Sequence, residues 1–138
     1  NESHAYADVE AVRVAEAQIR GPRALLGETW ERYRTPMAVT EVHLGCTREQ
    51  QMRWWQSVLH AVHALRDEGA DVRAITAWAA YGSFDWASLC TRDTGVYEPG
   101  LFDVRSDPPR PTALAGLVAA AAAGEAPRHP ALAGPGWW

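Results

Sequence analysis

The residue with the clearest chemical potential is Glu41, a carboxylate inside a short apolar segment. Residues 37–42 are mostly apolar and partly β-branched, Pro36 precedes them, and a helical pattern follows Gly45. Such a segment is typical of a strand buried on both faces of a parallel sheet. A carboxylate there is costly to desolvate unless it is paired or faces a cleft. Because catalytic groups gather where parallel strands end, Glu41 is either a catalytic candidate or a hydrogen-bonded carboxylate at the sheet rim.

Two histidines are spaced so that they could bind a metal ion together. His60 and His63 are three positions apart on a predicted helix, which would let both imidazoles share a metal ion. No third ligand is near them in the sequence, so a solvated or boundary pair is favoured and we predict no metal and no cofactor. Cys46 and Cys90 match no zinc spacing and are too few for a disulfide framework. We expect reduced thiols in a cytoplasmic protein.

Helical patterns on either side of residues 37–42 predict the elements that position Glu41. Pro22 suits the first position of a helix. The predicted apolar stripe of that helix comprises Ala24, Leu25, Trp30 and Tyr33. Thr47 and Gln50 form a capping box that opens a longer helix, which ends near Gly69. The predicted buried face of this second helix comprises Met52, Trp55, Leu59, Val62 and Leu65.

The rest of the chain predicts a second strand, a long loop and a last helix. Residues 72–78 form another apolar run, and residues 79–111 are a long connection of a kind that is usually functional. An Ala-rich helix is expected from 112 to about 123, followed by a Pro/Gly-rich tail at 124–138. Near the N-terminus, residues 6–14 alternate apolar and polar side chains, which favours an extended segment.

Alternating strands and helices with short links predict an α/β fold with right-handed crossovers and parallel pairing. Two such strands cannot close a barrel, and their open edges would invite aggregation, so we expect part of a larger fold. The 138 residues suit one domain, and a net charge of −4 favours neither nucleic acid nor a membrane surface as partner. The longest apolar stretch, 117–123, is too short to span a membrane.

Three motifs stand in order along the chain: Thr40-Glu41, residues 77–86 (Ala-Trp-Ala-Ala-Tyr-Gly-Ser-Phe-Asp-Trp) and residues 97–104 (Tyr-Glu-Pro-Gly-Leu-Phe-Asp-Val). Together they resemble the C-terminal part of the β-glycosidases of glycoside hydrolase family 1, in order and spacing, over about residues 22–123. The first resembles the Thr-Glu pair that ends strand 7, and the others resemble the strand-8 signature and the segment after it. More narrowly, the chain resembles the glycosidase-like half of bacterial proteins in which such a barrel precedes a dTDP-4-dehydrorhamnose reductase-like domain.

The resemblance implies the C-terminal segment of a (β/α)8 TIM barrel, incomplete by itself. Residues 1–20 would be a lead-in after strand 6, and residues 21–123 would run from helix 6 through strands 7 and 8 to helix 8. Residues 124–138 would be a tail or linker. The chain would then need the remainder of the barrel as its partner, supplied by missing N-terminal strands or by another subunit.

The resemblance also implies a retaining β-glycosidase that acts on a saccharide or glycoside. Glu41 would be the catalytic nucleophile, Asp85 would accept hydrogen bonds from sugar hydroxyls, and Trp78 and Trp86 would offer flat faces to the sugar. Against these roles stand an ordinary core position for Trp78 and a solvated loop acid for Asp85.

This sequence departs from the family pattern at several positions. The family's Asn-Gly after the nucleophile is Val42-His43 here, its early strand-8 Asp is Gly82, and its Glu is shortened to Asp85. No residue aligns with the acid/base, so the isolated chain is expected to be inactive. Two alternatives stay open: a non-catalytic carbohydrate-binding relic, and a partner domain of the fused nucleotide-sugar reductase.

Overall fold

The computed structural model describes residues 20–136 and 138. In this part of the chain α1 (Pro22–Tyr33), β1 (Met37–Val42), α2 (Arg48–Asp67), β2 (Val72–Ala77) and α3 (Ala113–Ala122) form the body. The connection from β2 to α3 contains β3 (Ser83–Phe84), β4 (Tyr97–Glu98), β5 (Phe102–Asp103) and β6 (Arg110–Pro111). A short 3-10 turn, η2 (Pro130–Ala133), follows α3. The extended segment predicted for residues 6–14, and the lead-in apart from Arg20, lie outside the described residues.

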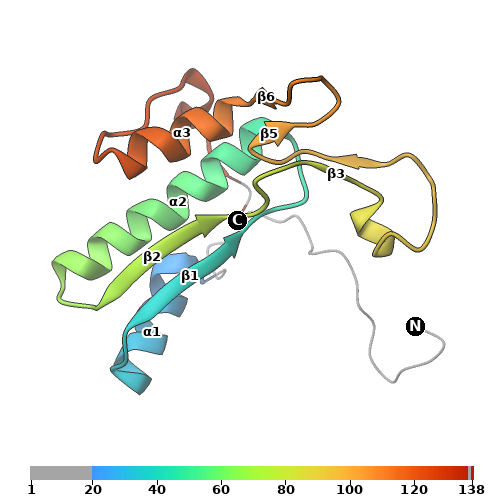
Figure 1. Ribbon diagram of the computed structural model, residues 1–138. Helices are drawn as coiled ribbons and strands as arrows, with labels where there is room; N and C mark the ends of the chain where they lie inside the picture. Colours follow the sequence, from blue (N-terminus) through green and yellow to red (C-terminus); the bar gives the residue numbers. More distant parts are fainter. Residues whose placement is uncertain (1–19, 137) are drawn as a thin grey trace.

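The two main strands pair in parallel, with α2 as the crossover between them. Met37 lies opposite Val72 and Val42 opposite Ala77. The mixed α/β class predicted from the sequence is therefore confirmed. Figure 1 shows β3, β5 and β6 gathered at the arrowhead end of β1 and β2. The long connection thus lies where the strands end, which is the position expected for functional groups.

The core of this structure forms along α2. Thr47 caps the helix, and its hydroxyl accepts a hydrogen bond from the Gln50 N–H at 3.4 Å, as the capping box predicts. The whole predicted face is buried: Met52, Trp55, Leu59, Val62 and Leu65. Burying an aliphatic side chain of this size contributes about 1.5–3 kcal/mol, so this face stabilises the fold strongly.

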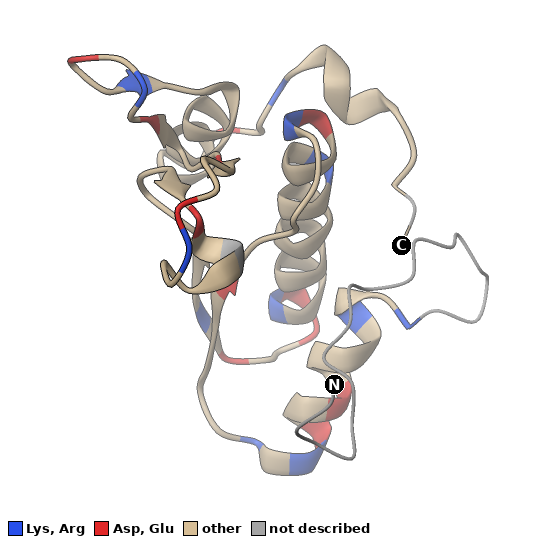
Figure 2. Cartoon of the chain, turned by 90° about the vertical axis from the view of Figure 1, so that its right-hand side faces the viewer, with Lys and Arg blue, Asp and Glu red and all other residues tan. Residues whose placement is uncertain are grey.

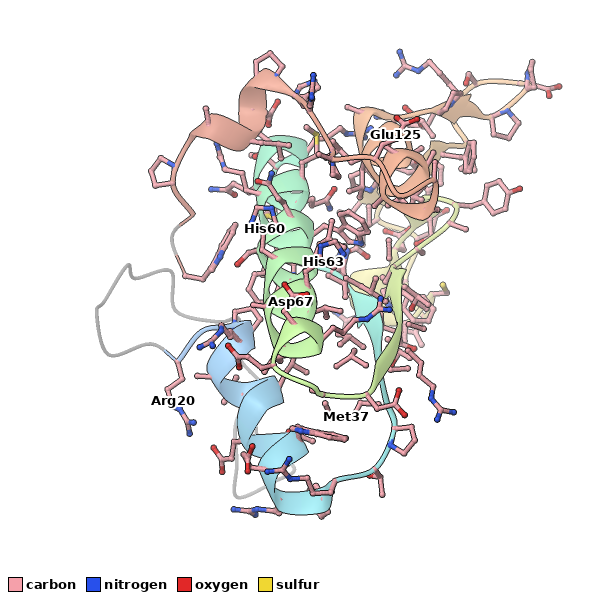
Figure 3. The ribbon with its side chains drawn as sticks, turned by 90° about the vertical axis from the view of Figure 1, so that its left-hand side faces the viewer. Arg20, Met37, His60, His63, Asp67 and Glu125 are labelled. Carbon is pink, nitrogen blue, oxygen red and sulfur yellow. The ribbon has the colours of Figure 1, made fainter. Side chains whose placement is uncertain are left out.

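Two predictions of burial are wrong. The helix α1 contains no buried residue, and Leu25 and Tyr33 of its predicted stripe are 51% and 62% exposed. Among the described residues, the strands are covered on one face only, since Ala38, Thr40, Ala74 and Thr76 are exposed. Figure 3 shows α1 and α2 on the same side of the two strands. A two-stranded sheet is too narrow to bury α1, and no described element packs against the other face of the sheet.

Both signs of charge occur along α1 and α2 (Figure 2), and Arg23 pairs with Glu68 between the two helices. Two residues of the tail at 124–138 contact α2. Arg53 Nη1 donates to the carbonyl of Ala131 at 3.2 Å, and the rings of Trp54 and Trp138 lie 5.2 Å apart.

None of the described helices is long and apolar enough to cross a membrane.

Candidate functional site

Glu41 lies near the carboxyl end of β1, where the pairing with β2 is irregular. The register shifts between Val39 and Val42, and Glu41 has a left-handed backbone with φ of 57°. Its N–H donates to Thr76 Oγ1 at 3.1 Å instead of a strand carbonyl. A non-glycine residue held in this conformation costs about 1–3 kcal/mol, and such strain clusters at functional sites. The residue is exposed, so water can reach it here.

The end of β1 is joined to the end of β2 by two further hydrogen bonds. The N–H of Trp78 donates to the carbonyl of Val42 at 3.1 Å, and Nδ1 of His43 lies 3.2 Å from the carbonyl oxygen of Trp78. The other ring nitrogen of His43 lies 2.9 Å from Oε1 of Glu98, on β4. Sequence reasoning treated His43 only as a departure and missed Glu98, because nothing local connects two residues 55 positions apart.

The structure brings Trp78 and Trp86 together at the same end of the strands. Their ring centroids are 5.7 Å apart, with an angle of 46° between the planes. Trp86 is 42% exposed, so this aromatic pair presents a face to solvent. Through the Val42–Trp78 hydrogen bond, the pair is attached to the strand end that carries Glu41.

Asp85 is placed differently from the predicted sugar-binding residue. It is only 7% exposed, and its carboxylate accepts four hydrogen bonds: from the Thr94 hydroxyl and from the backbone N–H groups of Thr94, Gly95 and Val96. A carboxylate has about four acceptor positions, so none is left for a ligand. In this structure Asp85 therefore holds the loop at 94–96 instead of facing a sugar.

The space around Gly82 explains why this chain has a glycine where the pattern that it resembles has an aspartate. A Cβ added at Gly82 would overlap the hydroxyl of Tyr97 and approach the carbonyl oxygen of Glu98 to 2.9 Å. The hairpin of β3 and β4 thus occupies the space that an aspartate side chain would need.

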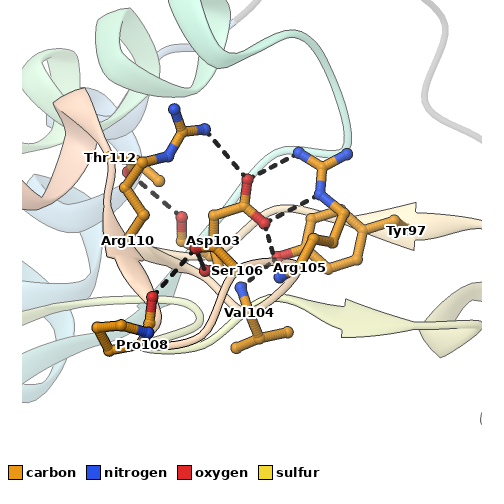
Figure 4. A network of polar contacts seen from close by, with 9 residues as sticks. Tyr97, Asp103, Val104, Arg105, Ser106, Pro108, Arg110 and Thr112 are labelled. Atoms are coloured by element: carbon orange, nitrogen blue, oxygen red, sulfur yellow. Dashed lines mark hydrogen bonds and ion pairs between the residues drawn. The ribbon is translucent and has the colours of Figure 1, made fainter.

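Asp103 is the centre of a polar network that folds the far half of the loop (Figure 4). Its carboxylate accepts hydrogen bonds from Nε and Nη2 of Arg105 at 2.9 and 2.8 Å, and Arg110 lies at 3.4 Å. The Arg105 guanidinium also stacks on Tyr97, 4.3 Å from the ring centroid. Hydrogen bonds from the Arg105 side chain and then from its backbone N–H hold the pKa of Asp103 far below its ordinary value.

We expect the free energy of unfolding to fall in acid because of these two aspartates. The Thr94 hydroxyl, followed by the N–H groups of the 94–96 loop, lowers the pKa of Asp85 as well. A lowered folded-state pKa adds stability that is complete above the unfolded value, about 4, and is lost as the pH falls toward the folded value. Urea denaturation between about pH 5 and pH 2 measures this loss.

The matched variants for this pH series are Asp103→Asn and Asp107→Asn. The first removes the buried carboxylate and should flatten the dependence on pH, whereas the second changes an exposed residue of the same loop and should not. An equally steep acid loss in Asp103→Asn would contradict the assignment.

Two concavities flank these groups. An apolar groove of about 300 Å³ beside β1 is lined by Glu41 and His43 together with Leu25, Trp54 and Trp138. A smaller cavity of about 210 Å³ is lined by Trp86, Glu98, Cys46 and Gln51. His43 and Glu98 meet between the two. Within residues 20–136 and 138, no cluster of three or more histidine, cysteine or acidic side chains could hold a metal, and His60 and His63 are both exposed on α2.

Comparison of the chain with protein-family models, with curated proteins and with solved structures finds no match.

Proposed function

We propose that this chain is a segment of a (β/α)8 barrel of the family 1 β-glycosidase kind. In this proposal Glu41 is the nucleophile of a retaining enzyme, and Trp78 and Trp86 form part of its sugar subsite. The observation that carries it is the exposed residue Glu41, on a left-handed backbone at the carboxyl end of a parallel strand. A hydrogen bond attaches this strand end to the pair of half-buried Trp78 and exposed Trp86.

The unfinished sheet supports the barrel part of the proposal. Among the described residues β1 and β2 pair only with each other, so each strand has an open edge. The exposed side chains on the bare face are small: Ala38, Thr40, Ala74 and Thr76. An apolar groove follows the open edge of β1. Further strands, from an upstream segment or another subunit, would cover these surfaces. We propose this remainder of the barrel as the partner of the chain, and we also propose a cytoplasmic location.

The chemistry would be a double displacement at the anomeric carbon. A Glu41 oxygen attacks that carbon while an acid protonates the departing glycosidic oxygen, which gives a glycosyl ester on Glu41. Water, deprotonated by the same second carboxyl, then cleaves the ester with overall retention. This second carboxyl must lie about 5–5.5 Å from Glu41 and would come from the remainder of the barrel.

A second candidate is a carbohydrate-binding relic that has lost catalysis. The placement of Asp85 favours it. This residue stands where the strand-8 signature of the family has a glutamate, but all the acceptor positions of its carboxylate are taken by hydrogen bonds from the loop at 94–96. In the relic, the tryptophan pair would bind a saccharide and Glu41 would form no ester.

Trapping with a 2-deoxy-2-fluoro-β-glycoside separates the two candidates. The complete polypeptide made from its native gene is incubated with the trap, and its intact mass and peptides are measured. One added sugar on the peptide that contains Glu41 is the result expected for a retaining glycosidase. Saccharide binding without any added mass would favour the relic, and a sugar attached to another carboxylate would overturn the role of Glu41.

A further inference from the structure

The imidazole of His43 lies between two groups that both accept hydrogen bonds. Nδ1 faces the backbone carbonyl of Trp78 at 3.2 Å, and Nε2 faces the carboxylate of Glu98 at 2.9 Å. A neutral imidazole donates from one nitrogen only, whereas an imidazolium donates from both. Both contacts are satisfied together when His43 is an imidazolium paired with the Glu98 carboxylate.

The surroundings keep this pair partly shielded. The side chains of His43 and Glu98 are only 20% and 29% exposed. The other charged groups beside His43 are Glu41 and Arg20, which line the same groove. Tyr97 and Cys46 line the cavity next to Glu98.

The pair connects three parts of the chain that lie far apart in the sequence. His43 follows β1, Trp78 follows β2, and Glu98 belongs to the hairpin of β3 and β4. The peptide group of Trp78 is held at its N–H by Val42 and at its carbonyl by His43. The indole of Trp78 in turn contacts Trp86. Fixing this backbone therefore fixes the aromatic pair relative to the strand end that carries Glu41.

We propose that His43 is a positioning residue that acts as an imidazolium clasp between Glu98 and the carbonyl of Trp78. The clasp holds the Trp78–Trp86 pair at the end of β1. Its use in sugar binding rests on the proposed function, but the clasp itself does not. It can be tested without any substrate.

The first measurement is NMR of the complete polypeptide labelled with 15N-histidine, near neutral pH. The signals of His43 are identified by their loss in His43→Gln. We expect both ring nitrogens of His43 to carry hydrogen in the unaltered protein. Glu98→Gln keeps an acceptor oxygen but loses the charge, so the doubly protonated signal should be lost or strongly reduced. A singly protonated ring in the unaltered protein would overturn the proposal.

The second measurement is the exciton couplet that the two close, tilted indoles give in circular dichroism. The contribution of this pair is isolated as the difference from Trp86→Phe. We expect it to shrink in His43→Gln and in Glu98→Gln while the helical signal is retained. The control is His60→Gln, on the exposed face of α2, which should leave the couplet and the His43 signals unchanged. An unchanged couplet in both clasp variants would refute a positioning role.

Discussion

Glu41→Gln is expected to reduce glycoside turnover by the complete protein at least about 10³-fold, because an amide cannot form the glycosyl ester. The substitution keeps the size and shape of the side chain. Glu41 is exposed, and its hydrogen bond to Thr76 is made by the backbone N–H, so the variant should fold normally. Initial rates with an aryl β-glycoside measure the loss, and an unchanged melting temperature shows that it is chemical.

The matched control for this experiment is Glu31→Gln, an exposed glutamate on α1, which should leave turnover unchanged. A stronger test uses Glu41→Gly with added azide. Glycine accepts the left-handed backbone at this position, and the azide ion can attack the anomeric carbon in place of the missing carboxylate. The product should then be a glycosyl azide of inverted configuration. Full activity of Glu41→Gln would refute the role of Glu41.

Local patterns explain why part of this fold could be predicted from the sequence. The face of α2 and its cap follow from spacing within one helix, and the structure has both. The bounds of β1 match the predicted residues 37–42. Pro36 before the strand and the irregular segment after Val42 mark its two ends in the sequence. The carboxyl-end position of Glu41 follows directly from those bounds.

The remaining features depend on contacts between distant segments. The stripe on α1 was predicted from periodicity, but its burial depends on how wide the sheet beneath it is. Asp85 is assigned to a sugar through the resemblance, and the backbone donors at 94–96 that surround it depend on how the loop folds. His43 and Glu98 meet only because β4 folds back over the strand ends. Periodicity contains no information on any of these contacts.

Gly100→Ala is expected to destabilise the protein by about 3 kcal/mol or more, the upper range for overpacking. A Cβ at this position would lie 2.5 Å from the carbonyl carbon of Tyr81 and 2.6 Å from both the Ala79 oxygen and the Gly82 nitrogen. These are backbone atoms that cannot rotate away. Hydrogen bonds hold them in place, from the Leu101 N–H to the Ala79 carbonyl at 2.9 Å and from the Gly82 N–H to the Phe102 carbonyl at 3.0 Å.

Gly116→Ala is the matched control, since Gly116 lies in α3 and an added Cβ has nothing within 4 Å. There the same substitution should be neutral or stabilise the protein by up to about 1 kcal/mol, through helix propensity. Urea denaturation of both variants measures the two effects. Equal stability of the two would contradict the close backbone packing at Gly100.

The effect of Gly100→Ala should reach the candidate site before the core. Gly100 lies between Glu98 and the segment that pairs with Ala79 and Ala80, so a shift there moves the clasp carboxylate and the backbone next to Trp78. The atoms that the added Cβ would crowd belong to residues 79–82, outside the buried core cluster along α2, although Leu101 next to Gly100 packs against that cluster. We therefore expect the Trp78–Trp86 couplet to disappear at urea concentrations at which the α2 helical signal is still intact. Simultaneous loss of both signals would mean that the long loop and the α2 core unfold as one unit.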